Sequence, residues 1–211
     1  MKNGKRTFWI LNSVHGFLVL TDGLLTYLGT PDLTYEANPL VSVFGLGWGA
    51  LFTVNVMVFS LCIVLSYYNY VKYKRPEIPY EGYCEYSSML FYGRPDRFRW
   101  SFYKLPKYWK PVFAASGYAL GIALPADRFI IDFQWVLFLT DSPIERIYNP
   151  FRSLFPWGRF DVVFATVLLI VLVIRWTFKE CKLNRLELIR QKEQKISGQI
   201  KPLEENKLLW R

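Results

Sequence analysis

The sequence predicts an all-α membrane protein built as a four-transmembrane-helix bundle, and three observations lead to this fold class. The 211-residue chain is 52% hydrophobic and 18% aromatic, which is unusually apolar for a soluble domain of this length. Its apolar residues gather in four long runs. These runs alternate with basic segments, and the formal net charge is +9. Such alternation is typical of multi-pass membrane proteins.

Each apolar run is long enough to be a candidate span, because about 20 mainly apolar residues cross roughly 30 Å of hydrocarbon. Residues 7–28 and 40–67 form a predicted first helical hairpin within residues 1–67. Residues 112–130 and 160–178 form a second hairpin within residues 112–178.

The third span is the least regular of the four. Pro125, Asp127, Arg128 and Asp132 interrupt its apolar run. We therefore expect a span up to about Phe129. Residues 130–139 then either continue this helix outward or lie along the membrane interface.

The distribution of Lys and Arg predicts the orientation. Residues 1–6 hold three basic residues, and the segments 68–111 and 179–211 hold nine each. In contrast, residues 29–39 hold none and residues 139–159 hold only three. Basic residues are retained on the cytoplasmic side, so both chain ends are predicted to be cytoplasmic.

The two largest polar segments are predicted to lie in the cytoplasm. Residues 68–111 mix aromatic and basic side chains, which favours a loop packed on the inner membrane surface over a dedicated partner-binding module. Residues 179–211 interleave charges of both signs and should extend the fourth helix into water. The predicted partners are anionic lipids of the cytoplasmic leaflet and other protein chains, including copies of this one. No nucleic-acid-binding motif is present, so nucleic acid is not predicted as a partner.

The cysteine and histidine content favours neither a disulfide nor a metal centre. Cys62 lies in the second span, Cys84 in the predicted loop and Cys181 in the tail, and they show no metal-ligand spacing. We therefore predict no disulfide, no metal site and no cofactor. His15 is the only histidine, and it is predicted to be packed and hydrogen-bonded instead of acting as a ligand or proton relay.

Asp22 is the clearest candidate for function in the first span, because ionisable residues inside a membrane are costly. Counted from Phe8, it lies about 21 Å along the helix. Helical spacing places Asp22 on one polar face with His15 and Thr26. That face should contact other helices and not lipid.

The third span offers partners at the same depth. Asp127 lies about 22 Å along its helix from Val112, Arg128 follows it, and Asp132 comes one turn later. An ion pair of Asp22 with Arg128, or of Arg128 with Asp132, would lower the cost of burying these charges. A functional cluster and a purely structural ion pair both remain open.

The connection between the first two spans has a structural explanation that covers only part of it. Asn38 and Pro39 suit the start of a helix, and Gly29 suits the end of one. Helix capping explains neither Glu36 nor Asp22. Both therefore stay candidate site residues, and Asn38 is kept with them.

The stretches TDGLLTYLG and YEANPL resemble the signature of a family of small prokaryotic membrane proteins of unknown function. In that family an Asp-x-x-x-Thr pattern closes the first span and Glu-x-Asn-Pro opens the second. The resemblance covers residues 12–66, and the matching positions are Asp22, Thr26, Gly29, Glu36, Asn38 and Pro39. It implies a prokaryotic inner-membrane location. Relatives tend to carry a lysine in the second span, where this chain has Asn55.

Three classes of function follow. The preferred one is a non-catalytic subunit or assembly partner in a membrane complex, because no recognised catalytic motif is present and the catalytic residues, if any, are unknown. The second is a small transporter or ion-coupled carrier that uses a carboxylate cluster near the outer leaflet, with Asp22, Glu36, Asp127 and Arg128 around the transport path. The third is an intramembrane enzyme on a lipid-linked substrate, with Asp22 and Glu36 sharing acid and base roles.

Overall fold

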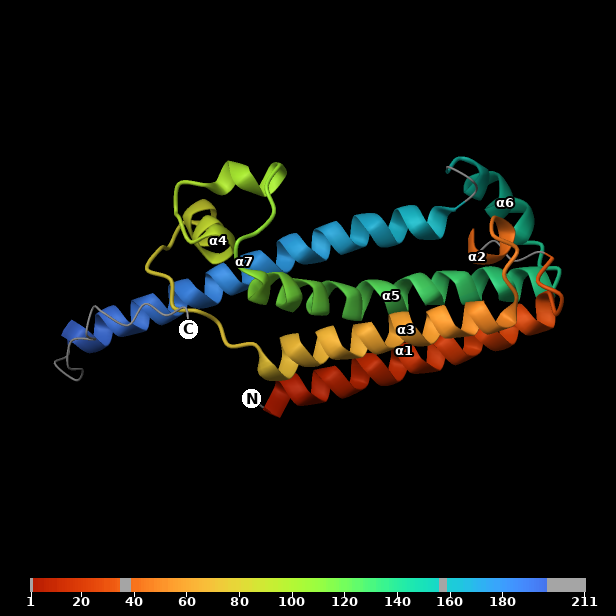
Figure 1. Cartoon of the computed structure of the whole chain (residues 1–211), viewed down its shortest axis with the longest axis horizontal. Coiled ribbons are helices and arrows are strands. Elements are labelled where there is room, and N and C mark those ends of the chain that lie inside the picture. Colours follow the sequence, from red (N-terminus) through yellow and green to blue (C-terminus); the bar gives the residue numbers. More distant parts are fainter. Residues whose placement is uncertain (1, 35–38, 156–158, 197–211) are drawn as a thin grey trace. The chain divides into compact units, whose positions relative to one another are not determined.

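In the computed structural model, residues 2–34, 39–155 and 159–196 are described, and every regular element in these ranges is helical (Figure 1). In chain order the elements are α1 (Lys2–Gly29), α2 (Pro39–Ser42), α3 (Trp48–Tyr67), the π-helix η1 (Tyr68–Lys72), α4 (Tyr83–Tyr92), the 3-10 helix η2 (Phe98–Phe102), α5 (Trp109–Leu139), α6 (Glu145–Ser153) and α7 (Phe160–Ile196). The predicted all-α class is confirmed.

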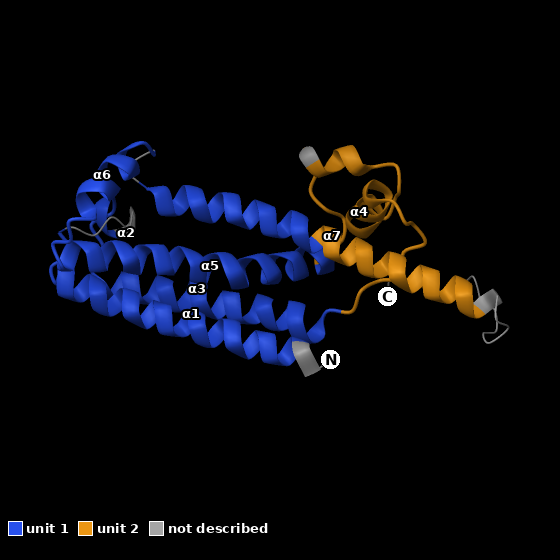
Figure 2. Cartoon of the chain, turned by 180° about the vertical axis from the view of Figure 1, so that it is seen from behind, with its two compact units in different colours: residues 1–73, 110–176 blue, residues 74–109, 177–211 orange. Residues whose placement is uncertain are grey.

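Two compact units make up the chain (Figure 2). The first combines Met1–Tyr73 with Lys110–Trp176, and the second combines Lys74–Trp109 with Thr177–Arg211. The boundary in the loop falls close to the predicted end of the first hairpin. The predicted loop and tail belong to one unit.

Among the described residues, three helical segments are long and apolar enough to cross a membrane. They are Gly4–Gly29, Trp48–Lys72 and Phe160–Gln194. Their large apolar side chains are widely exposed, as Leu20, Phe52 and Ile170 illustrate. In water such exposure would oppose folding, whereas in hydrocarbon it carries no cost. These helices indicate a membrane-embedded protein.

Helix α5 is a long helix of the first unit, but it is not one of these three candidate spans. It lies between α7 on one side and the pair α1 and α3 on the other (Figure 1). Its buried positions are mostly small, namely Ala114, Ala115, Gly117, Ala119, Gly121 and Ala123. Small residues let helix backbones approach closely inside a membrane. The neighbouring helices therefore cover much of α5.

Glycine makes the contact between α5 and α3 possible. A Cβ on Gly117 would collide with the backbone carbonyl of Leu65, and a Cβ on Gly121 would lie 3.1 Å from the Ser66 hydroxyl. On its other side α5 packs Ala119 and Ala123 against Leu172 of α7. This close approach of α5 to α3 therefore depends on the absence of a side chain at residue 117.

The predicted second span, residues 40–67, is wrong in one respect. The chain forms α2, breaks after Ser42 and begins α3 only at Trp48. Gly45 has φ of +64°, which an L side chain rarely adopts, and Gly47 is extended with φ of −85° and ψ of −171°. Pro39 does start a helix, but it is the short α2. Asn38 lies outside the described residues.

The helix predicted as the third span, residues 112–130, is longer than expected. Helix α5 continues from Trp109 to Leu139, so residues 130–139 extend the helix instead of turning along the interface. Pro125 sits inside α5 without ending it. A proline removes one backbone hydrogen bond, and neighbouring helices in a bundle can tolerate that loss.

The second unit is held together by contacts between the loop and the distal half of α7. The Asn184 side chain accepts from the Ile78 N–H at 3.3 Å and donates to the Ile78 carbonyl at 2.8 Å. Arg75 donates to Glu180 at 2.8 Å and to Glu187 at 3.0 Å. Tail residues thus act as a docking surface for the loop, a contact that the sequence analysis did not anticipate.

Helix α4 lies within residues 68–111, which the sequence analysis predicted only as a loop. It spans Tyr83–Tyr92 and ends at Gly93, whose φ of +72° allows a left-handed cap. Its Tyr83 ring stacks on Phe178 of α7 at 4.0 Å between centroids. The prediction that the tail continues the fourth helix is confirmed, since α7 runs for 37 residues.

Replacing Gly117 by Ala should destabilise the bundle by about 1–3 kcal/mol, because the added methyl group forces α5 away from the Leu65 carbonyl. Gly23, in α1, has open space around its Cβ position. Gly23→Ala should therefore stabilise by about 0.5–1 kcal/mol through its backbone entropy. Unfolding in detergent, followed by circular dichroism, measures both. Unchanged or increased stability of Gly117→Ala would contradict the proposed close approach.

Candidate functional site

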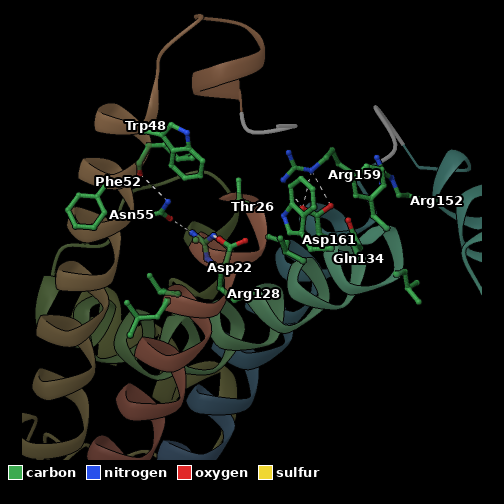
Figure 3. Close-up of a pocket in the computed structure, with 18 of the residues that line it drawn as sticks. Asp22, Thr26, Trp48, Phe52, Asn55, Arg128, Gln134, Arg152, Arg159 and Asp161 are labelled. Carbon is green, nitrogen blue, oxygen red and sulfur yellow. Dashed lines mark hydrogen bonds and ion pairs between the residues drawn. The ribbon is translucent and has the colours of Figure 1, made fainter. Parts of the chain in front are cut away.

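Three helices contribute to a polar cluster inside the bundle. Arg128 of α5 donates through Nη1 to the Asp22 carboxylate of α1 and through Nη2 to the Asn55 side-chain oxygen of α3 (Figure 3). The Asn55 amide nitrogen donates a hydrogen bond to the Leu51 carbonyl at 3.0 Å, which turns the Asn55 side-chain oxygen towards Arg128. The predicted pair of Asp22 and Arg128 is thus confirmed.

The alternative pair of Arg128 with Asp132 is not formed. Asp132 is 6% exposed, and neither of its carboxylate oxygens has a hydrogen-bond partner among the described residues. One oxygen of Asp127 is likewise buried without a described partner. Both residues lie near the cluster in sequence, but neither lines the pocket beside it. Glu36 and Asn38 lie outside the described residues, so their relation to the cluster stays a prediction.

A pocket of about 400 Å³ adjoins this cluster within the first unit. It lies where α1 and α5 end and α3 and α7 begin, and α6 also lines it. Its apolar and aromatic wall includes Leu51, Phe52, Trp48, Trp135 and Phe138. Its polar lining consists of Asp22, Thr26, Asn55, Arg128, Gln134, Glu145, Tyr148, Asn149, Arg152, Arg159 and Asp161. Two of the predicted site residues besides Asp22, namely Thr26 and Arg128, are therefore pocket residues.

A second ion pair lies on the far side of the pocket from Asn55 (Figure 3). Arg159 donates through Nε to both oxygens of Asp161, at 3.1 and 3.0 Å, and through Nη2 at 2.6 Å. Asp161 is 2% exposed and lies in the first turn of α7, where the helix dipole favours a carboxylate. The sequence analysis missed this pair. An acidic residue in the first turn of a span is the signal that could have revealed it.

Helix α6 closes another side of the pocket and was not predicted. Its Tyr148 hydroxyl accepts a hydrogen bond from Gln134 of α5 at 2.7 Å, which ties the two helices together. Burial raises the pKa of Tyr148, so its hydroxyl keeps its proton and can donate a hydrogen bond to a ligand. The spacing of Glu145, Asn149 and Arg152 on one helix face is the pattern that could have revealed α6.

His15 is buried on α1 but does not line the pocket. Its ring meets Phe59 edge-on at 5.0 Å, while its Nδ1 has no hydrogen-bond partner among the described residues. The packed position agrees with the prediction, whereas the predicted hydrogen bond is not made by Nδ1. Across the described part of the chain, no group of three or more His, Cys, Asp or Glu residues could hold a metal ion.

Comparisons with protein-family models, with curated proteins and with solved structures find no match for this chain. The resemblance based on Asp22, Thr26 and the Glu-x-Asn-Pro stretch therefore stays a prediction.

The Asp22–Arg128 pair should be strongly coupled. Asp22→Asn or Arg128→Gln alone leaves a buried charge without a counter-charge and should cost about 3–5 kcal/mol. The double variant should lose clearly less than the sum of the two. Unfolding of wild type, the two single variants and the double variant in detergent gives the coupling energy between Asp22 and Arg128.

The exposed pair of Glu81 and Lys192, at 2.6 Å, is the matched control and should couple by less than about 1 kcal/mol. Additive losses for Asp22 and Arg128 would show that the two charges do not depend on each other.

Proposed function

We propose that this chain is a four-span membrane protein that binds a small amphipathic ligand in the pocket beside Asp22 and Arg128. The pocket carries this proposal, because it combines fixed charges with an aromatic wall inside a membrane-type bundle. Its volume of about 400 Å³ falls in the range of about 300–1,000 Å³ typical of small-molecule sites.

The proposed topology counts α5 as the fourth crossing. It has 31 residues, lies beside the three apolar helices and is covered by them, so it can reach across the bilayer without being uniformly apolar. With four crossings the basic segments 1–6, 68–111 and 179–211 fall on one side, which we infer to be the cytoplasm. The family resemblance favours a prokaryotic inner membrane.

This topology places the pocket near the outer leaflet. Helix α1 starts at the proposed cytoplasmic side and ends at the pocket, and α3 returns from there. A ligand would therefore enter from the outer leaflet or from the outer solution.

The charged groups of the pocket favour binding over catalysis. Asp22 and Asp161 each accept hydrogen bonds from an arginine, which fixes both carboxylates in place. Such pairs serve to position a ligand and to shape its surroundings. A general base instead needs access to a substrate proton.

A native cysteine tests the topology. Cys84 is exposed in the loop, whereas Cys62 and Cys181 are buried. A membrane-impermeant maleimide added to intact cells should leave Cys84 unlabelled and should label it in inverted membrane vesicles. In a Cys84→Ser background, Thr34→Cys, which is exposed between α1 and α2, should show the opposite pattern. Labelling of Cys84 in intact cells would overturn the proposed orientation.

Two glycines test the pocket. Gly23 lines it and has open space around its Cβ position, and Gly49 of α3 has equally open space but is not a lining residue. The Gly23→Phe ring should fill part of the pocket and lower the amount of co-purified small amphipathic molecule at least tenfold. Gly49→Phe should leave it unchanged. Native mass spectrometry of the detergent-purified protein measures both. If wild type carries and binds no such molecule, the proposed binding function is wrong.

A second candidate function, a subunit or assembly partner in a membrane complex, is favoured by the second unit. There Arg97 and Lys104 lie over the Trp100 ring at 4.8 and 4.2 Å from its centroid. Such a cation and aromatic cluster is common at protein interfaces. Stable co-purification of another chain, lost in Trp100→Ala, would support this role.

A further inference from the structure

Helix α6 has an unusual distribution of polar and apolar residues. One face, with Glu145, Tyr148, Asn149 and Arg152, lines the pocket. The opposite face is apolar and exposed: Ile144 at the N-cap is 54% exposed, Ile147 77%, Phe151 41% and the C-cap Leu154 78%. The polar face of this helix thus points into the protein and its apolar face points out.

This arrangement indicates what surrounds α6. In water a short helix turns its apolar face inward, because exposed apolar area costs about 25 cal/mol per Å². A helix at a membrane interface instead places that face in the acyl region. The outward Ile147 and Leu154 therefore suit a position among lipids, with the polar face turned to the pocket.

The charges of the pocket show what the polar face can bind. Of its three arginines, Arg128 is paired with Asp22 and Arg159 with Asp161. Arg152 and Glu145 remain, and neither forms an ion pair within the described residues. Glu145 accepts only a neutral hydrogen bond from Asn149, at 3.2 Å.

The two remaining charges are opposite in sign and lie on the same face of α6. They are seven residues apart, which is two turns and a rise of about 10 Å. Both side chains are long enough to reach towards each other over Tyr148 and Asn149. A ligand that satisfies them therefore carries an anion and a cation a few bonds apart.

We propose that this pocket binds the head group of a zwitterionic phospholipid with a primary amine, taken from the leaflet around α6. Arg152 and the Tyr148 hydroxyl donate to the phosphodiester, and Glu145 accepts from the ammonium group. The aromatic wall with Trp48, Phe52 and Phe138 takes the start of an acyl chain. This inference rests on the proposed binding function and names its ligand.

The test measures head-group preference with the purified full-length chain in detergent. Phosphatidylethanolamine, phosphatidylcholine and phosphatidylglycerol of identical acyl chains compete for the protein, and native mass spectrometry reads out the bound lipid. Wild type should prefer phosphatidylethanolamine at least tenfold over both others. Phosphatidylcholine lacks ammonium protons to donate, and phosphatidylglycerol lacks the cation.

Four variants of α6 locate the preference. Arg152→Gln should weaken binding of all three lipids at least tenfold, because all share the phosphate. Glu145→Gln should remove the preference for phosphatidylethanolamine over phosphatidylglycerol while leaving phosphatidylglycerol binding intact. Arg146→Gln is the matched control, since Arg146 is exposed on α6 and does not line the pocket. Arg152→Lys, which keeps the charge, should recover part of the lost binding.

Soluble O-phosphoethanolamine and inorganic phosphate are added as competitors to separate a lipid from a free phosphorylated amine. They should displace the bound lipid at least a hundredfold less well than phosphatidylethanolamine does. Equal potency of O-phosphoethanolamine overturns the lipid assignment. Lipid binding without head-group preference, or unchanged in Arg152→Gln and Glu145→Gln, overturns the roles of these residues. Either result leaves the pocket-blocking effect of Gly23→Phe as a separate measure of the binding function.

Discussion

The hydrogen-bonded cluster of Asp22, Arg128 and Asn55 is the interaction on which the rest of the first unit depends. A charged side chain among apolar helices costs several kcal/mol unless it is paired. Arg128 meets this cost by reaching two other helices at once. Because each contact exists only at one relative height of the helices, the cluster fixes how far α1, α3 and α5 slide past one another. The pocket lies directly beside this cluster, so the same relative heights of the helices set its shape.

Close packing in the first half of α5 supports the same relative position of the helices. Gly117 and Gly121 bring α5 against α3, and Ala119 and Ala123 bring it against α7. Inside a membrane no hydrophobic driving force pushes apolar side chains together, because lipid is as apolar as they are. Helix association there relies on close packing and hydrogen bonds. Helix α5 supplies both, with small residues in its first half and Arg128 in its second.

Much of this arrangement could be predicted from the sequence because membranes impose simple rules. The apolar runs gave the positions of α1, α3 and α7, and equal depth along two helices predicted the pairing of Asp22 with Arg128. The break at Gly45 was missed, since glycine in an apolar run does not by itself indicate positive φ. Asn55 was noted but not assigned a role, because its partner lies 73 residues away. Helix α6 was missed because it is short, contains Pro150 and mixes polar with apolar residues, so no continuous apolar run indicates it.

The outward apolar face of α6 has a consequence for how the protein should be handled. With Ile147 and Leu154 exposed, few protein contacts hold this helix from outside. The surrounding acyl chains then act as part of the scaffold, much as a neighbouring subunit would. Bilayer thickness and the choice of detergent thereby become structural variables of the pocket, as influential as a side chain in its wall.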